Sequence, residues 1–122
     1  MQPHLLIAAI LMVLIGAIHS VLGEILIFQR LRKNGWIPTE GAPILKESHV
    51  RILWATWHLG SVFGWGMACL LFQMAHQPSE TGTEGVIALS SALAGLLVLV
   101  GTHGRHPGWV GLLAVALLIW LF

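Results

Sequence analysis

Charged side chains and cysteine are scarce in this chain of 122 residues. Only 9% of the residues are Asp, Glu, Lys or Arg, against about 25% in an ordinary soluble domain, and 57% are hydrophobic. A water-soluble core of this size cannot bury so much apolar surface. The composition therefore predicts an integral membrane protein, with the lipid bilayer around a single transmembrane domain over 1–122.

The same scarcity excludes several kinds of site. Cys69 is the only cysteine, so neither an internal disulfide nor a metal site made of cysteines alone can form. The net charge is only +1 and there is no basic tract, which argues against nucleic acid as a partner, because such binding needs several Lys or Arg contacts to phosphates. Neither an HExxH nor a CxxC motif occurs. Any site must therefore be assembled from scattered residues.

Four apolar runs predict four transmembrane helices. The first, about 5–28, exceeds the roughly 20 residues that a span needs, and it lacks the basic start and cleavage pattern of a signal peptide. The second covers about 44–75. The last two, about 86–102 and 108–122, are short and form a helical hairpin around Gly104 and Pro107. The predicted fold class is an all-α integral membrane four-helix bundle with a short final helical hairpin.

The Lys and Arg residues indicate the orientation of this bundle. Five lie in or beside the basic loop 29–43, and Arg105 lies in the last link, whereas the N-terminus and the link 76–85 have none. The positive-inside rule then places loops 29–51 and 102–108 in the cytoplasm and both termini outside. The predicted location is the cell inner membrane, with several passes.

Ionisable residues gather in the cytoplasmic half of the predicted bundle. At a rise of about 1.5 Å per residue, the ionisable residues of the first two helices lie at similar depths below the cytoplasmic surface. The last two helices are short, so the turn between them would reach the same depth. Ionisable groups are costly inside a bilayer, which makes this layer the candidate functional site. Its members are His19, Glu24, His58, His103, Arg105 and His106.

The side chains of this layer do not all point in the same direction around their helices. His19 and Glu24, five residues apart, point in directions that differ by about 140°, whereas Ser20 and Glu24, four apart, share a face. Glycines at 16, 23, 60 and 64 leave room for close helix packing or for a flat cofactor. The second helix carries a polar and aromatic stripe that would face the bundle or a ligand: Trp54, Trp57, His58, Ser61, Trp65 and Cys69.

The histidines predict a cofactor or metal site as the main function. His19 and His58 would be the two axial ligands of a b-type haem, with Arg105 at a propionate. A transition metal such as Fe, Cu or Zn would instead draw on carboxylate and imidazole ligands. That set is His19, Glu24, His58, His103 and His106.

Two other functions stay open. One is a transporter of protons or ions, in which Glu24 is the intramembrane carboxylate, His19, His58 and Ser61 relay protons, and a homo-oligomer forms the path. The other is a non-catalytic subunit or assembly factor of a larger membrane complex, in which Glu24 pairs with Arg105. The sequence indicates no particular reaction.

Overall fold

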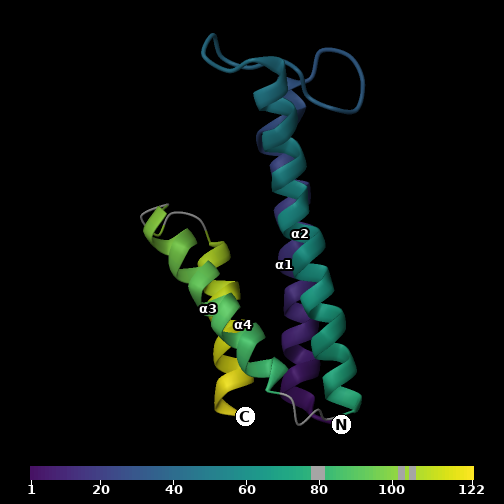
Figure 1. The fold of residues 1–122 in the computed structure, drawn as a ribbon, viewed down its shortest axis with the longest axis vertical. Helices are drawn as coiled ribbons and strands as arrows, with labels where there is room; N and C mark the ends of the chain where they lie inside the picture. Colours follow the sequence, from purple (N-terminus) through teal and green to yellow (C-terminus); the bar gives the residue numbers. More distant parts are fainter. Residues whose placement is uncertain (78–81, 102–103, 105–106) are drawn as a thin grey trace. The chain divides into compact units, whose positions relative to one another are not determined.

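A computed structural model describes residues 1–77, 82–101, 104 and 107–122. These residues form α-helices and one short 3-10 helix, with no strand among them (Figure 1). The predicted all-α class with four α-helices is confirmed for the described part of the chain. The elements are α1 (Pro3–Leu26), η1 (Phe28–Leu31), α2 (Glu47–His76), α3 (Thr83–Gly101) and α4 (Gly108–Leu121).

α1 is the most apolar long helix in the described residues. Its 24 residues contain no charged side chain before Glu24. At a rise of about 1.5 Å per residue it is about 36 Å long, more than the hydrocarbon thickness of about 30 Å. By length and composition, it is the one helix among the described residues that is long and apolar enough to cross a membrane.

The chain reverses direction after α1 through a hydrogen-bonded loop. Ile27 N–H still donates to the Gly23 carbonyl (3.1 Å), and η1 then buries Phe28. The Leu31 carbonyl accepts hydrogen bonds from the backbone N–H groups of Thr39 (3.0 Å) and Glu40 (2.9 Å), which closes the loop between them. This closure holds the residues that follow η1 near the end of α1.

α2 begins at Glu47, later than the predicted start at 44. Residues 42–45 form a turn instead, because Leu45 N–H donates to the Ala42 carbonyl at 2.8 Å. The first helical turn carries an exposed ion pair between Arg51 and Glu47 (3.0 Å), four residues apart. Lys46 and the residues before it therefore belong to the basic loop.

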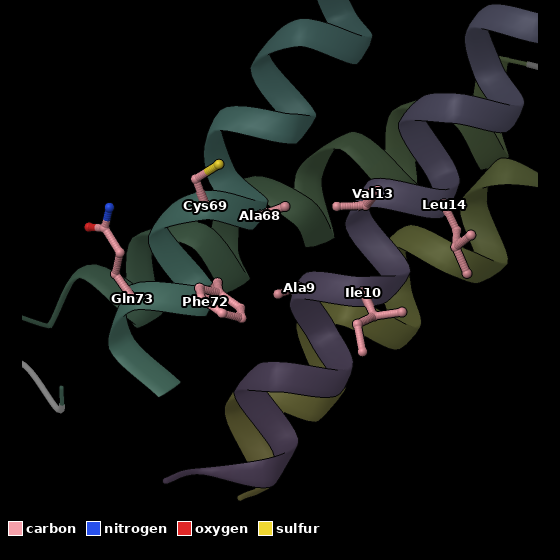
Figure 2. A pocket seen from close by; sticks show the side chains of 8 residues that line it. All are labelled: Ala9, Ile10, Val13, Leu14, Ala68, Cys69, Phe72 and Gln73. Atoms are coloured by element: carbon pink, nitrogen blue, oxygen red, sulfur yellow. The ribbon is translucent and has the colours of Figure 1, made fainter. Parts of the chain in front are cut away.

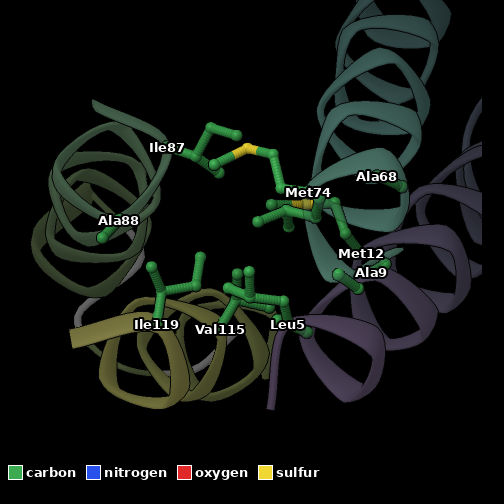
Figure 3. Packing of buried hydrophobic residues seen from close by; sticks show 12 residues of the cluster. Leu5, Ala9, Met12, Ala68, Met74, Ile87, Ala88, Val115 and Ile119 are labelled. Atoms are coloured by element: carbon green, nitrogen blue, oxygen red, sulfur yellow. The ribbon is translucent and has the colours of Figure 1, made fainter. Parts of the chain in front are cut away.

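The described chain divides into two compact units. One contains Met1–Ile15 and Gly64–Phe122, and the other contains Gly16–Phe63. In the first unit, α3 and α4 pack along each other, and Gln2 N–H donates to the Ala75 carbonyl (2.8 Å). Small and large apolar side chains from all four helices form its core (Figure 3): Leu5, Ala8, Ala9, Met12, Ala68, Leu71, Met74, Ala75, Ile87, Ala88, Val115 and Ile119.

A glycine and a proline lie between the two helices of the final hairpin of this unit. Gly104 has a positive φ of 73°, and its N–H donates to the Leu99 carbonyl at 2.8 Å, a closure typical of helix C-termini. Pro107 is the N-cap of α4, and Trp109 Nε1–H donates back to the Gly104 carbonyl (3.2 Å). These are the two residues from which the sequence predicted a break between the last helices.

An open apolar groove of about 400 Å³ lies between α1 and α2 in the same unit (Figure 2). One wall comes from the early turns of α1 and the other from the late turns of α2, including the exposed Cys69. None of His19, Glu24 and His58 lines it. The full lining is Ala9, Ile10, Val13, Leu14, Ala68, Cys69, Phe72 and Gln73.

Candidate functional site

The candidate site lies within the unit Gly16–Phe63, where the later turns of α1 meet the early turns of α2. Ser20 and Glu24 lie one helical turn apart on α1, as their spacing predicted. Trp54, His58 and Ser61 lie at intervals of four and three residues on α2. Each set therefore occupies one helix face, and the hydrogen bonds between the two faces define the site.

The Glu24 carboxylate accepts from three side chains at once. Its Oε1 accepts from Trp54 Nε1–H (2.6 Å) and from His58 Nε2–H (2.9 Å). Its Oε2 pairs with an Arg32 guanidinium nitrogen at 2.5 Å. The carboxylate also raises the pKa of Arg32 above its ordinary value, mainly through their hydrogen bond, so the guanidinium stays charged. A cation thus neutralises the one carboxylate of this site, and two ring N–H donors orient it.

His58 continues the network away from Glu24. A carboxylate only accepts hydrogen bonds, so His58 Nε2 carries a hydrogen, and in the neutral ring Nδ1 is then the acceptor. Nδ1 lies 2.8 Å from Ser20 Oγ, which is also hydrogen-bonded to Ser61 Oγ at 2.8 Å. Ser61 is buried. Glu24, His58, Ser20 and Ser61 therefore form one unbroken hydrogen-bonded chain.

An aromatic frame surrounds this chain. The His19 ring stacks on the Trp57 indole, with centroids 4.4 Å apart and planes 6° from parallel. Trp57 Nε1–H also donates to the His19 backbone carbonyl at 3.0 Å. Phe28 packs against both Trp57 (5.8 Å) and His58 (6.0 Å). These contacts hold Trp57 and His58 against α1 and η1, and they hold the His19 ring on the tryptophan.

The structure brings Glu24 and His58 together but gives His19 a different neighbour. His19 lies on Trp57, consistent with its angular offset from Glu24. Among the described residues, no three His, Cys, Asp or Glu side chains are grouped so that they could hold a metal ion. The other predicted site residues, His103, Arg105 and His106, lie outside the described residues.

Arg32 is the member of the site that the sequence did not reveal. The sequence predicts an ion pair of Glu24 with Arg105, and it indicates no role for Arg32 beyond the orientation of the bundle. Arg32 follows Glu24 by eight residues, so a continuous helix would place it about 12 Å further along the axis. It reaches the carboxylate because α1 ends at Leu26 and the chain turns back. Ser20 was noted for sharing a face with Glu24, the signal by which its role could have been found.

Gly23 supplies a first testable prediction. A Cβ at this position would overlap the Trp57 indole, with two ring carbons at 2.8 Å and the ring nitrogen closer still. The space that Gly23 leaves is therefore filled by the Trp57 indole and not by a flat cofactor. Overpacking typically costs about 1–3 kcal/mol, so we expect Gly23→Ala to lower the melting temperature and displace Trp57.

Gly60→Ala is the matched control for this change. A Cβ at Gly60 would meet only His19 Nε2, at an ordinary contact distance of 4.0 Å. Thermal unfolding in detergent, followed by circular dichroism, compares the two variants. Equal melting temperatures for Gly23→Ala and Gly60→Ala would contradict the packing described here.

Comparison with protein-family models, with curated proteins and with solved structures finds no match to this chain.

Proposed function

We propose that the chain is an integral membrane protein of four helices in a cell inner membrane. The outer surface of the unit Gly16–Phe63 supports this proposal, since its α1 and α2 segments expose large apolar side chains. So many exposed large apolar side chains are unfavourable in water and suited to lipid. These side chains are Ile18, Val21, Leu22, Ile25 and Leu26 on α1, and Ile52, Leu53, Leu59, Val62 and Phe63 on α2.

The residues beyond these helix ends support an orientation with the basic loop in the cytoplasm. Arg30 and Lys33 are exposed, and so is Trp36, at 91%. Cations and tryptophan are the residues enriched at the cytoplasmic membrane interface. On this orientation Glu24 and His58 lie in the cytoplasmic half of the membrane, and both termini face outward.

The function proposed for the site is proton transfer. The observation that carries this proposal is the unbroken chain from Glu24 through His58 and Ser20 to Ser61. A serine hydroxyl can donate or accept, so the hydrogen bond between Ser20 and Ser61 can run in either direction. In the arrangement that transfers a proton, Ser61 donates to Ser20, Ser20 donates to His58 Nδ1, and His58 Nε2–H donates to Glu24. A proton arriving at Ser61 can move each hydrogen one place along this chain. Imidazole suits such a step, because it can accept a proton on one ring nitrogen while it gives up a hydrogen from the other.

Arg32 defines the cytoplasmic end of this path. Its guanidinium lies on the second oxygen of Glu24, opposite the oxygen that accepts from His58. A proton that reaches Glu24 weakens this ion pair, because the carboxyl loses its charge. Release of Arg32 would then open the carboxyl to the cytoplasmic side. A homo-oligomer would complete the outward half of the path, since two helices alone do not enclose one.

The haem and transition-metal hypotheses stay predictions. Both nitrogens of His58 and both oxygens of Glu24 already have partners, so either ligand would have to give up a hydrogen bond to bind Fe, Cu or Zn. A b-type haem between His19 and His58 would also have to part His19 from Trp57. An absorption spectrum and metal analysis of the purified protein test these predictions directly.

Proton flux into liposomes tests the proposed function. Protein reconstituted with an internal pH-sensitive dye, at a clamped membrane potential, is expected to acidify or alkalinise the lumen faster than protein-free liposomes. The glutamine in His58→Gln can still form hydrogen bonds but cannot accept and release a proton. We therefore expect the proton flux to fall at least about tenfold, because a positioned acid–base group typically changes a rate by more than that.

His49→Gln is the control, because His49 is exposed in the first turn of α2 and outside this chain. It should retain the wild-type flux. Wild-type protein that conducts no better than empty liposomes, or a His58→Gln variant that conducts normally, would contradict proton transfer. A silent but stably folded protein would favour the subunit or assembly-factor function, with the network as a structural element.

A further inference from the structure

The chain of hydrogen bonds also contains the three groups of an acyl-transfer enzyme. Ser20 Oγ lies 2.8 Å from one ring nitrogen of His58, and the other ring nitrogen lies 2.9 Å from the Glu24 carboxylate. A hydroxyl, an imidazole and a carboxylate in this order form the constellation that activates a serine, recognised by geometry and not by position in the sequence. Both distances lie in the range for proton transfer. We infer that Ser20 is a nucleophile that attacks esters of long-chain acids.

The carboxylate in this constellation is held in place independently of the histidine. Arg32 binds its second oxygen, and Trp54 Nε1–H shares the first oxygen with His58. A carboxylate fixed in this way selects the His58 tautomer with hydrogen on Nε2. Nδ1 is then left unprotonated and aimed at Ser20, as a general base requires. Nδ1 faces the serine and Nε2 the acid, the reverse of the serine proteases, in which Nε2 takes the proton from the serine. Either ring nitrogen of a neutral imidazole can be the acceptor, depending on the tautomer.

The proposed step balances with water as the co-reactant. Ser20 Oγ attacks the ester carbonyl carbon while its hydrogen passes to His58 Nδ1, and Glu24 stabilises the resulting imidazolium. The C–O bond to the alcohol then breaks, and His58 returns the proton to the leaving alcohol. Water then attacks the acyl-Ser20 while one of its hydrogens passes to His58 Nδ1. The bond to Ser20 Oγ breaks, the acid leaves, and His58 returns the proton to Ser20. Ser61 is hydrogen-bonded to the attacking oxygen of Ser20 and holds it in position for this step.

The surroundings of Ser20 favour an apolar acyl chain as the substrate. Ser20 itself is half-buried and faces α2, and Val21, the next residue around α1, is exposed and apolar. A substrate that reaches Ser20 from the side of Val21 meets an aliphatic side chain. In a membrane, the ester groups of lipids lie at the border of the hydrocarbon, within reach of a site less than two turns from the end of α1. Water-soluble short esters lack this contact and should react more slowly.

A fluorophosphonate probe tests the inference on the whole purified protein. A long-chain alkyl fluorophosphonate is expected to add once, with the adduct located on Ser20 by peptide mass spectrometry. We expect His58→Gln to slow labelling at least about tenfold, since the general base is lost. Ser48→Ala removes an exposed hydroxyl in the first turn of α2 and should leave labelling unchanged. A polar, short-chain fluorophosphonate should label Ser20 more slowly than the alkyl probe.

The outcomes separate this inference from proton transfer. No adduct on the wild-type protein, an adduct on another residue, or a rate that His58→Gln leaves unchanged would overturn it. The adduct is mapped on the wild-type chain, so the identity of the labelled residue does not depend on whether a variant folds. Labelling of Ser20 without proton flux would support the nucleophile alone, and flux without labelling would support the relay alone.

Discussion

Replacing Glu24 by alanine is expected to destabilise the protein more than any other single substitution in the site. Trp54, His58 and Arg32 all lose their common acceptor, and a cation is left beside an apolar helix pair. Removing one partner of a fully buried pair costs about 3–5 kcal/mol. The side chains of Glu24 and Arg32 remain 30% and 22% exposed, so solvent screening should reduce the loss to about 2–3 kcal/mol.

Unfolding in a denaturing detergent, followed by tryptophan fluorescence, measures this loss. Glu40→Ala is the matched control, because Glu40 is exposed and only its backbone N–H is seen to form a hydrogen bond. Surface changes of this kind usually stay within about 0.5 kcal/mol. Glu24→Gln should fall between the two, since an amide oxygen can still accept from Trp54 or His58 but does not pair with Arg32. Equal stability of Glu24→Ala and Glu40→Ala would show that the network contributes nothing.

The second large effect expected is a loss of defined orientation when the positive charge is redistributed. All six Lys and Arg residues lie on the side assigned to the cytoplasm. Neutralising Arg30, Lys33, Lys46 and Arg51 to Gln leaves Arg32 and Arg105, and Gln77→Lys with Glu84→Lys places two lysines on the other side. With equal numbers on the two sides, on the order of half of the molecules should insert in the inverted orientation.

Reporters fused to the C-terminus, one active only in the cytoplasm and one only outside it, measure the two populations. The control exchanges Arg for Lys, and Lys for Arg, at the same four positions, which keeps the charge and should keep a single orientation. The wild-type C-terminus is expected outside. A cytoplasmic C-terminus in the wild type, or a redistributed variant that stays in one orientation, would contradict the proposed topology.

Much of the secondary structure follows from local chemistry. The apolar runs and the polar, glycine- and proline-containing links between them predict four helices, because helix length and helix ends depend on residues close in sequence. The same reasoning placed Ser20 and Glu24 on one face and turned His19 away from it. In the structure Ser20 and Glu24 contact the two nitrogens of one ring, and His19 lies on Trp57.

Local chemistry does not predict which side chains of the site pair with one another. Helix length predicts that six ionisable residues lie at similar depth, but equal depth leaves the rotation of each helix about its own axis undefined. Contact with His58 depends on the register between α1 and α2, which the Trp57 indole on Gly23 sets. Whether His103, Arg105 and His106 join this layer stays a prediction, since they lie outside the described residues.

Sequence alone determined the helical class, the apolar character and the one-sided charge, because each is a sum over neighbouring residues. Only the tertiary structure decided that Arg32 pairs with Glu24. That contact requires α1 to end at Leu26 and the loop to close on the Leu31 carbonyl. It also linked His58 to Ser20 and Ser61, because hydrogen-bonded chains require distances near 2.8 Å between groups more than 35 residues apart in sequence.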